Sequence, residues 1–99
     1  MDIYRDIAED PVFVESARRI EPDARRWDEI MDGVCWAISR NPSEFPEVRK
    51  GSNLRLVLTD AYPGIPALRI LFLQESVDRC VLLDVSIVKD AEQVTVTGE

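Results

Sequence analysis

Basic side chains are the groups in this sequence that could do chemistry, and they are few. The chain has 12 lysines and arginines against 19 aspartates and glutamates, and Arg49, Lys50 and Arg55 form its one basic cluster. Such side chains can bind phosphate, because guanidinium and ammonium groups donate hydrogen bonds to anionic oxygens. The alternative is an ordinary solvated loop. The sequence therefore offers a phosphate-binding or target-binding site at Arg49 and Lys50, with Arg55 beside them.

Several kinds of chemistry are excluded by the composition. The sequence contains no histidine, which removes the usual general base, the Ser-His-Asp and Cys-His arrangements and any histidine-based metal site. Cys35 and Cys80 lack CxxC spacing, so two buried thiols are expected. We expect no metal ion and no cofactor. The net charge of −7 works against attraction to polyanions, and a nucleic-acid contact would need a local basic patch.

The bulk properties describe one small domain. Its 99 residues are 45% hydrophobic and 31% charged, which is an ordinary composition for a single modest core. We expect one domain over residues 1–99, in which residues 89–99 form either an edge strand or a mobile tail. The first residues lack the apolar stretch of a signal peptide, and no apolar run approaches the ~20 residues that span a bilayer. A soluble cytoplasmic protein without membrane contact is therefore expected.

Three apolar runs, separated by turn signals, must position the candidate side chains. They cover residues 54–59, 67–74 and 79–88, with a loop rich in proline at 60–66 and a polar turn at 75–78. Side chains alternate along a strand, and turn residues of this kind end one strand and start the next. The pattern predicts an antiparallel meander of three strands.

The register of the last two strands decides which side chains share a face. A four-residue turn closed by Gln74 and Arg79 places Arg69 opposite Asp84. One face then carries only apolar side chains, namely Leu68, Ile70, Phe72, Val81, Leu83, Val85 and Ile87. That face needs a cover, whereas Arg69 and Asp84 lie on the other face. Arg69 is then either a functional residue or one half of a cross-strand ion pair with Asp84.

The first strand of the meander adds to both faces. Its three leucines alternate with other residues, and the arrangement considered is the one in which they lie on the apolar side: Leu54, Leu56 and Leu58. Arg55 then joins Arg69 on the uncovered side. This arrangement predicts a face of the sheet on which arginines from two neighbouring strands meet.

Two helices are predicted ahead of these strands, after a short first strand at residues 3–8. Asp10 and Pro11 are typical of a helix start, because aspartate caps free amides and proline is tolerated at the first helical position. Apolar residues then recur at helical spacing: Phe13, Ala17 and Ile20. The competing interpretation is a strand at residues 12–14.

The second helix, over residues 23–40, has the clearest apolar stripe. Its members follow the helical repeat: Trp27, Ile30, Met31, Val34, Cys35 and Ile38. Trp36 lies about 180° away from Trp27, on a charged face, because successive residues are ~100° apart. Either the first helix or the loop at 41–53 covers Trp36, or this side chain contacts a partner chain.

The order of these elements resembles that of the RelE/ParE superfamily of bacterial toxins. The residues that carry the resemblance are the helix end Cys35–Pro42, the strand Leu54–Leu58 and the hairpin formed by Leu68–Phe72 and Val81–Val85. The resemblance covers about residues 3–90. It implies an α+β fold of RelE/ParE type: a short first strand, a two-helix hairpin and a three-stranded antiparallel meander.

The resemblance also implies roles for individual residues. Arg69 stands at the position of the family's strand arginine and Arg55 at that of the first basic residue on the preceding strand, so both are the candidate catalytic residues. Lys89 follows the last strand where the family often has Lys-Arg, and would join Arg49 and Lys50 in binding phosphate. The family's further basic residue, second arginine and tyrosine are replaced by Val57, Asp90 and Val96.

Three functions are compatible with this resemblance. The first is the toxin of a type II toxin–antitoxin pair that binds its target, such as the translation machinery or DNA gyrase. The second is an mRNA endoribonuclease of RelE type, and the third is a non-toxic regulatory or scaffold domain. The resemblance implies a cognate antitoxin as partner, with ribosome, mRNA or gyrase as target, in a homodimer or a toxin–antitoxin hetero-oligomer.

Overall fold

The chain folds into two helices and a four-stranded sheet. The computed structural model describes residues 6–61, 63–64 and 66–88. The elements in chain order are β1 (Asp6–Glu9), α1 (Pro11–Ile20), α2 (Ala24–Arg40), the 3-10 helix η1 (Pro42–Glu44), β2 (Leu54–Leu58), β3 (Leu68–Ser76) and β4 (Arg79–Ile87). The predicted α+β class is confirmed. The predicted mobile tail or edge strand at 89–99 lies outside the described residues.

The sheet is mixed and has the order β1-β4-β3-β2. The pairs β2–β3 and β3–β4 are antiparallel, as predicted, but β1 lies parallel to β4, with Asp6 opposite Arg79 and Glu9 opposite Leu82. The sequence predicted a short first strand and an antiparallel meander of three strands, but not that the first strand joins the sheet beside β4 as a fourth, parallel strand. A short strand at the start of the chain must find a partner for its amide and carbonyl groups, and the sequence does not reveal which strand that is.

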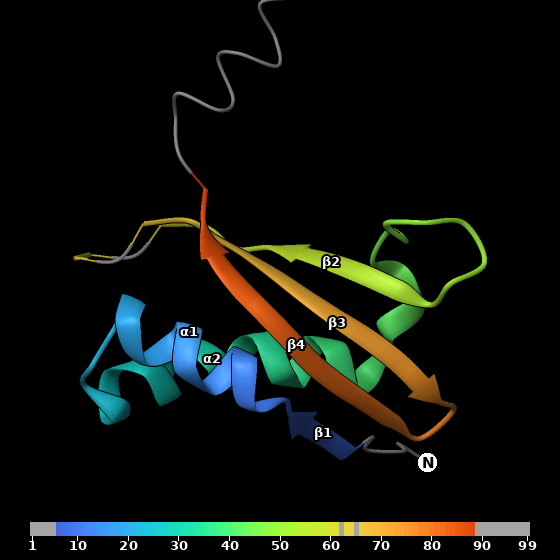
Figure 1. Cartoon of the computed structure of the whole chain (residues 1–99), viewed down its shortest axis with the longest axis horizontal. Helices are drawn as coiled ribbons and strands as arrows, with labels where there is room; N and C mark the ends of the chain where they lie inside the picture. The colour runs from blue at the N-terminus through green and yellow to red at the C-terminus, as the bar shows by residue number, and fades with distance from the viewer. Residues whose placement is uncertain (1–5, 62, 65, 89–99) are drawn as a thin grey trace, which may run out of the picture.

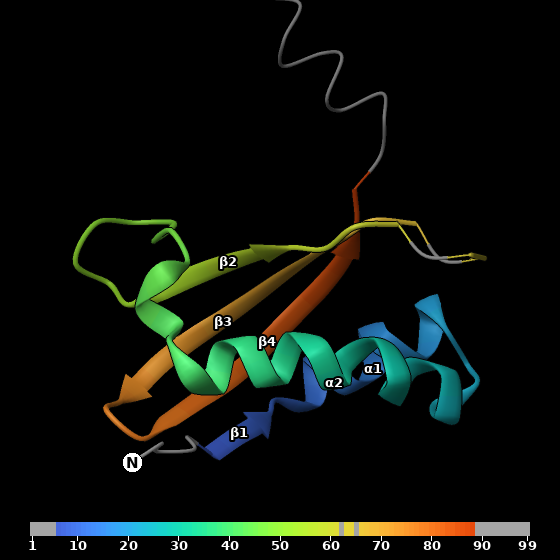
Figure 2. The ribbon, with the colours of Figure 1, turned by 180° about the vertical axis from the view of Figure 1, so that it is seen from behind.

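Both helices lie on one side of this sheet, as Figures 1 and 2 show from opposite directions. The side chains that fill the space between helices and sheet form one cluster: Phe13, Ala17, Trp27, Ile30, Met31, Val34, Ile38, Val57, Leu68, Ile70, Phe72, Cys80, Leu82 and Val85. The helix stripes predicted from the sequence are thus buried, although Ile20 and Cys35 are only partly covered. The opposite side of the sheet carries no helix in Figure 1.

The helix ends follow from local chemistry. Asp10 caps α1 by accepting a hydrogen bond from the amide of Val12, with Pro11 in the first turn, and Asp23 caps α2 by accepting from the amides of Arg25 and Arg26. The helix predicted from residue 10 onwards is therefore correct, and the alternative strand at 12–14 is wrong.

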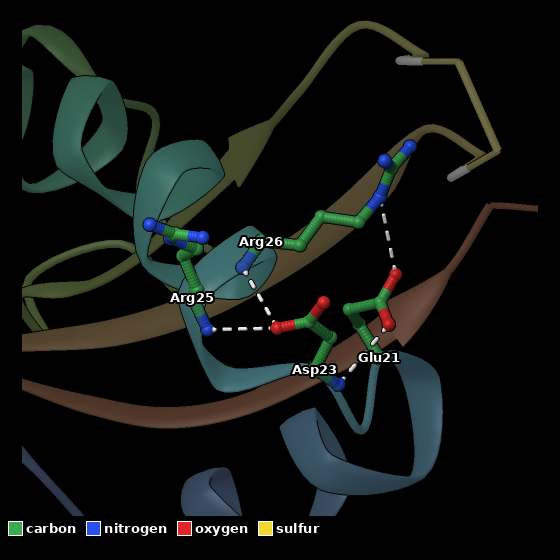
Figure 3. A network of polar contacts seen from close by, with 4 residues as sticks. All are labelled: Glu21, Asp23, Arg25 and Arg26. Carbon is green, nitrogen blue, oxygen red and sulfur yellow. Dashed lines mark hydrogen bonds and ion pairs between the residues drawn. The ribbon is translucent and has the colours of Figure 1, made fainter.

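A polar network joins the two helices at the linker between them (Figure 3). Arg26 in the first turn of α2 reaches Glu21 at the end of α1, with 3.3 Å between Nε and Oε1, while Asp23 caps the helix beside it. The same guanidinium lies against Gly64, where a Cβ would approach Arg26 to 3.0 Å. Arg26 thus connects the helix linker to the β2–β3 loop.

The hairpin between β3 and β4 has a tighter turn than predicted. Ser76 pairs with Arg79, so the turn contains only Val77 and Asp78. The Ser76 hydroxyl donates to the Asp78 carboxylate at 2.8 Å, and Glu75 forms an ion pair with Arg79 at 2.9 Å. These contacts hold the turn closed and shift the register.

The register shift separates the two residues expected to form an ion pair. Arg69 lies opposite Ser86 and Leu71 lies opposite Asp84. The predicted pairing of Arg69 with Asp84 was therefore wrong. The shorter turn and two irregularities in the pairing, one between Gln74 and Ser76 and one between Leu71 and Phe72, together set this register, because each changes which residues face each other.

A bulge at Leu83 also changes which side chains of β4 are buried. Leu71 pairs with Asp84 and Phe72 with Leu82, so Leu83 has no partner on β3. Such an extra residue reverses the alternation of faces beyond it. Of the four β4 residues predicted to face the core, only Val85 is buried; the other three are not: Val81, Leu83 and Ile87. Cys80 and Leu82 take their places.

The orientation of β2 is the opposite of the prediction. Arg55 pairs with Phe72 and Val57 with Ile70, both of which are fully buried. Paired residues point to the same face, so Arg55 and Val57 lie on the helix side. The three leucines of β2 therefore lie on the side away from the helices: Leu54, Leu56 and Leu58.

Neither described helix is long and apolar enough to cross a membrane.

We predict that Gly33→Ala stabilises the fold. Gly33 is exposed in the interior of α2, and a Cβ there would meet nothing within 4 Å, so the change gains helix propensity worth about 1 kcal/mol. Urea unfolding should show the increase. Gly51 offers a matched control, because its Cβ would also meet nothing but its φ is 80°. Gly51→Ala should lose roughly 1 kcal/mol, and a gain there would contradict the explanation.

Candidate functional site

The uncovered side of the sheet is a mainly apolar surface, which we call the open face. Its members come from the three antiparallel strands: Leu54, Leu56, Leu58, Arg69, Leu71, Leu73, Val81, Asp84 and Ser86. The predicted open face was expected to carry arginines from two strands. Instead, six of these nine side chains are aliphatic, and only Arg69 and Asp84 bear charge.

The loop before β2 extends this surface. The amide of Val48 donates to the carbonyl of Leu54 at 2.7 Å, and the amide of Leu56 donates to the carbonyl of Pro46 at 3.1 Å. Residues 46–48 therefore pair along the outer edge of β2. Val48 and Leu58 are 56% and 65% exposed, so large apolar side chains of the loop and the sheet remain in contact with water.

Arg69 is half-buried on the open face, between Leu58 of β2 and Ser86 of β4. No carboxylate of the described residues lies within ion-pair distance of it. A shallow hollow of about 250 Å³ lies beside Arg69, where Leu56 and Leu71 contribute apolar walls. The guanidinium is available to an anionic group of a partner, which a leucine-rich surface would partly shield from water.

Asp84 is held by a different residue from the one expected. The Ser16 hydroxyl of α1 donates to the Asp84 carboxylate at 3.0 Å. The contact is formed where α1 runs next to β4, beyond the short stretch that β1 covers. Asp84 therefore anchors α1 to the sheet, and Arg69 has no counter-charge within ion-pair distance among the residues that the structure describes.

Arg55 does not belong to the open face. Its Nη1 donates to the carbonyl of Phe45 at 2.7 Å, and its Nε is buried without a hydrogen-bond partner. Phe45 in turn packs edge-on against Phe72, with 5.8 Å between ring centroids. Arg55 thus fastens the 41–53 loop to the helix side of the sheet, and the expectation that it lies beside Arg69 was wrong.

The loop that carries Arg49 and Lys50 is ordered by one carboxylate. Glu47 accepts hydrogen bonds from the amides of Asn53 at 2.7 Å and Gly51 at 3.1 Å. These bonds, that from Asn53 most of all, lower the pKa of Glu47, because they favour the charged form. Gly51 and Asn53 have φ of 80° and 61°, which turns the chain back into β2 and leaves Arg49 and Lys50 exposed.

The predicted basic residues therefore do not converge. Arg49 and Lys50 precede β2, whereas Arg69 pairs with Leu58 at the other end of that strand. Arg55 points to the other side of the sheet, and Lys89 lies outside the described residues. Arg69 is the only one of the predicted basic side chains that the described part of the chain places on the open face.

Trp36 lies on the outer side of α2 and is 55% exposed. One of the two interpretations of the sequence expected α1 or the 41–53 loop to cover Trp36, and neither does. The guanidinium of Arg40 lies 4.8 Å from the ring centroid, in a cation–π arrangement. The role of Trp36 in binding a partner stays a prediction.

The two cysteines differ in their surroundings. Cys80 is fully buried in the core, and Cys35 is half-buried on α2. Burial raises the pKa of the Cys35 thiol to about 11, and the nearby carboxylates of Glu9 and Asp32 add to this effect. A thiol with such a pKa is almost wholly protonated at neutral pH, so Cys35 is a poor nucleophile.

Comparison with known proteins adds no identification. No known protein family matches the chain, and no curated protein sequence matches it.

The leucines of the open face are the residues that sequence reasoning missed. The sequence of β2 did show that the leucine side could be the exposed one, because Val57 on the other side is also aliphatic and can be buried in the core. The arginine between the leucines suggested that the leucine side was the buried one. That inference failed because Nη1 of Arg55 finds an acceptor on the helix side, the carbonyl of Phe45, although Nε stays without a partner.

We predict that Arg55→Ala destabilises the fold by about 2 kcal/mol, since it removes a charge-assisted hydrogen bond and leaves the Phe45 carbonyl without its donor. Urea unfolding measures the loss. Arg49→Ala is the matched control, because Arg49 is exposed and should change stability by less than about 0.5 kcal/mol. Equal effects of the two substitutions would contradict a structural role for Arg55.

We predict that Glu47 makes the fold sensitive to acid. Because its folded pKa is lowered, its stabilising effect is complete above the ordinary carboxyl pKa and is lost as pH falls through the folded value. Glu47→Gln should therefore lower the melting temperature at pH 7 more than at pH 3. Glu44→Gln in η1 serves as the control, and a difference between the two variants that is the same at both pH values would refute the prediction.

Proposed function

We propose that this chain acts by binding another protein through the open face, as the toxin component of a type II toxin–antitoxin pair. The observation that carries the proposal is the apolar character of that face, on which leucines of β2 and β3 surround a single arginine. Contiguous exposed apolar surface of this kind marks interaction sites, because its burial against a partner removes apolar area from water.

The energetics favour association through this face. Each leucine that passes from water into an interface gains about 1.5–3 kcal/mol when fully buried. Leu58 and Val48 are largely exposed and retain most of this potential, whereas the central leucines are half-buried. A partner that covers the open face would gain most of its affinity by burying these aliphatic side chains, Leu58 and Val48 above all, because they have the most exposed area to lose.

Arg69 would fix the orientation of the bound partner. It has no described carboxylate within ion-pair distance, so a carboxylate of the partner can pair with it inside a largely apolar contact. A charged pair in such surroundings fixes how the partner is placed, because a misplaced partner leaves the guanidinium buried and unpaired. The partner expected is a protein segment with apolar side chains and one well-placed acidic residue.

The toxin–antitoxin assignment rests on the order of elements. A short strand, two helices and three antiparallel strands is the order that resembles RelE/ParE toxins, and the pairings β2–β3 and β3–β4 agree with it. In this proposal the cognate antitoxin covers part of the chain, and the target is the translation or gyrase machinery of the cytoplasm. The complex is a hetero-oligomer of toxin and antitoxin or contains a toxin homodimer.

Binding is better supported than RNA cleavage. The candidate catalytic residues Arg55 and Arg69 lie on opposite sides of the sheet, and Arg55 is occupied by the Phe45 carbonyl. Cleavage of a phosphodiester needs several groups around one phosphate. The open face brings one basic side chain to that point, together with leucines that suit a protein partner.

We predict that expression of the chain in a bacterium arrests growth and that Leu58→Asp relieves the arrest. Leu58 is largely exposed, so the substitution spares the fold while placing a charge in the apolar contact. Val12→Asp is the matched control: Val12 is 58% exposed in α1 and is not among the residues of the open face. Colony counts after induction, with immunoblots for equal protein levels, measure the effect.

Three outcomes would contradict the proposal. Unimpaired growth during expression of the unchanged chain would favour a regulatory or scaffold domain. Equal relief by Val12→Asp would remove the open face from the mechanism. New 5′ ends of mRNA that appear on induction, and that Arg69→Ala abolishes, would establish the nuclease in place of the binding protein.

A further inference from the structure

A groove between α1 and α2 forms a second surface that the open face does not explain. It has a volume of about 420 Å³ and runs from Glu9, at the end of β1, to the linker at Glu21 and Pro22. Its accessible apolar floor comes from Val14, Pro22 and Ala24. Beneath them lie the buried rings of Phe13 and Trp27, 6.3 Å apart and at 55° to each other. The two helices therefore leave a hollow above the aromatic pair that joins them.

The rim of the groove is acidic. Glu9, Glu21 and Asp28 contribute carboxylates, and Arg18 contributes the one basic side chain that lines it. Glu21 is already paired with Arg26, whereas no described basic residue lies within ion-pair distance of Glu9 or Asp28. The rim thus offers two exposed carboxylates without an ion-pair partner among the described residues, next to an apolar floor.

We propose that this groove binds a basic amphipathic helix of a partner protein. An apolar side chain of that helix packs on Val14 and Ala24, above the buried aromatic pair, and its lysines or arginines pair with Glu9 and Asp28. Apolar contact and opposite charge together select this ligand, because neither a polyanion nor an uncharged apolar segment would satisfy both the floor and the rim.

The size of the groove and the charge of the chain agree with this occupant. α1 has 10 residues and is therefore about 15 Å long, which matches about three turns of a second helix. A second copy of the chain is a poorer ligand, because each copy carries a net charge of −7 and the two would repel each other. The inference goes beyond the proposed function, since it concerns a different surface and a ligand of opposite charge.

The test uses the full chain and a synthetic helical peptide of about 14 residues with leucine on one face and lysine on the other, labelled for fluorescence anisotropy. A scrambled peptide of the same composition keeps the charge and loses the apolar face. We expect the amphipathic peptide to bind at least about tenfold more tightly than the scrambled one, because only the former can bury its leucines. Equal binding of both, or no binding, would overturn the proposal.

Paired variants locate the site. The double variant Glu9→Gln, Asp28→Asn should weaken binding by about tenfold at low salt, the loss expected for two ion pairs at a surface. The control Glu44→Gln, Asp60→Asn removes the same charge from exposed positions outside the groove and should leave binding nearly unchanged. An equal loss in both would mean that the peptide responds to net charge alone, and the proposal would fail.

Trp27 provides a direct readout of the floor. The chain has two tryptophans, so Trp36→Phe leaves Trp27 as the only one, and the bound peptide should shift its emission. An unchanged emission at saturating peptide would overturn the groove as the site. Leu58→Asp should bind the peptide normally, because Leu58 lies on the open face; if it abolishes binding, the peptide occupies the open face. A negative result in these binding experiments would overturn the groove proposal alone, because the growth experiment tests the open face independently.

Discussion

The pairing of β2 with β3 is the constraint on which both faces of the sheet depend. With Arg55 opposite Phe72 and Val57 opposite Ile70, the leucines of β2 point away from the helices. A slip by one residue would exchange the two faces of the strand, because side chains alternate along it. The leucines would then enter the core and the arginine would face water. The character of the open face is therefore a consequence of register.

The 41–53 loop helps to keep that register. Its residues pair along the outer edge of β2, Phe45 packs on Phe72 and its carbonyl binds Arg55. An arginine on the core side of a strand would be costly without such a partner, since a buried charge needs hydrogen bonds. The same contacts protect half of an edge strand that could otherwise pair with another chain. One loop thus orients β2, covers its edge and adds Val48 to the open face.

The helices could be predicted from the sequence because their signals are local. Asp10 and Asp23 cap them through contacts two or three residues away, and the stripe from Trp27 to Ile38 follows a repeat that only a helix satisfies. The existence of the last three strands was equally clear. Their faces were not, because β2 carries aliphatic residues on both sides, and alternation cannot tell which side is buried.

The pairing of strands that are distant in the chain could not be predicted from the sequence. The parallel pairing of β1 with β4 joins residues that lie more than 70 positions apart, and no local signal specifies it. The turn at Val77 and Asp78 lacks the glycine or asparagine that usually marks a two-residue loop, so the longer turn was the natural expectation. The bulge at Leu83 then reversed the alternation of β4. The turn and the irregular pairing of β3 with β4 changed the partner of Arg69, whereas the orientation of β2 separated Arg55 from it.

In the function that we propose, the surface that results from these pairings serves association with another protein. A single arginine among leucines cannot supply the several converging groups that phosphate cleavage needs, but it can align a partner whose apolar side chains displace water. The charge of −7 acts at longer range, where it would speed the approach of a basic segment towards the groove between α1 and α2. The two surfaces would therefore bind ligands of different charge. The open face favours an apolar segment with an acidic residue, and the groove favours an apolar segment with basic residues. A protein that carries both kinds of segment could occupy both surfaces at once, and the linked contacts would then hold it more tightly than either surface alone.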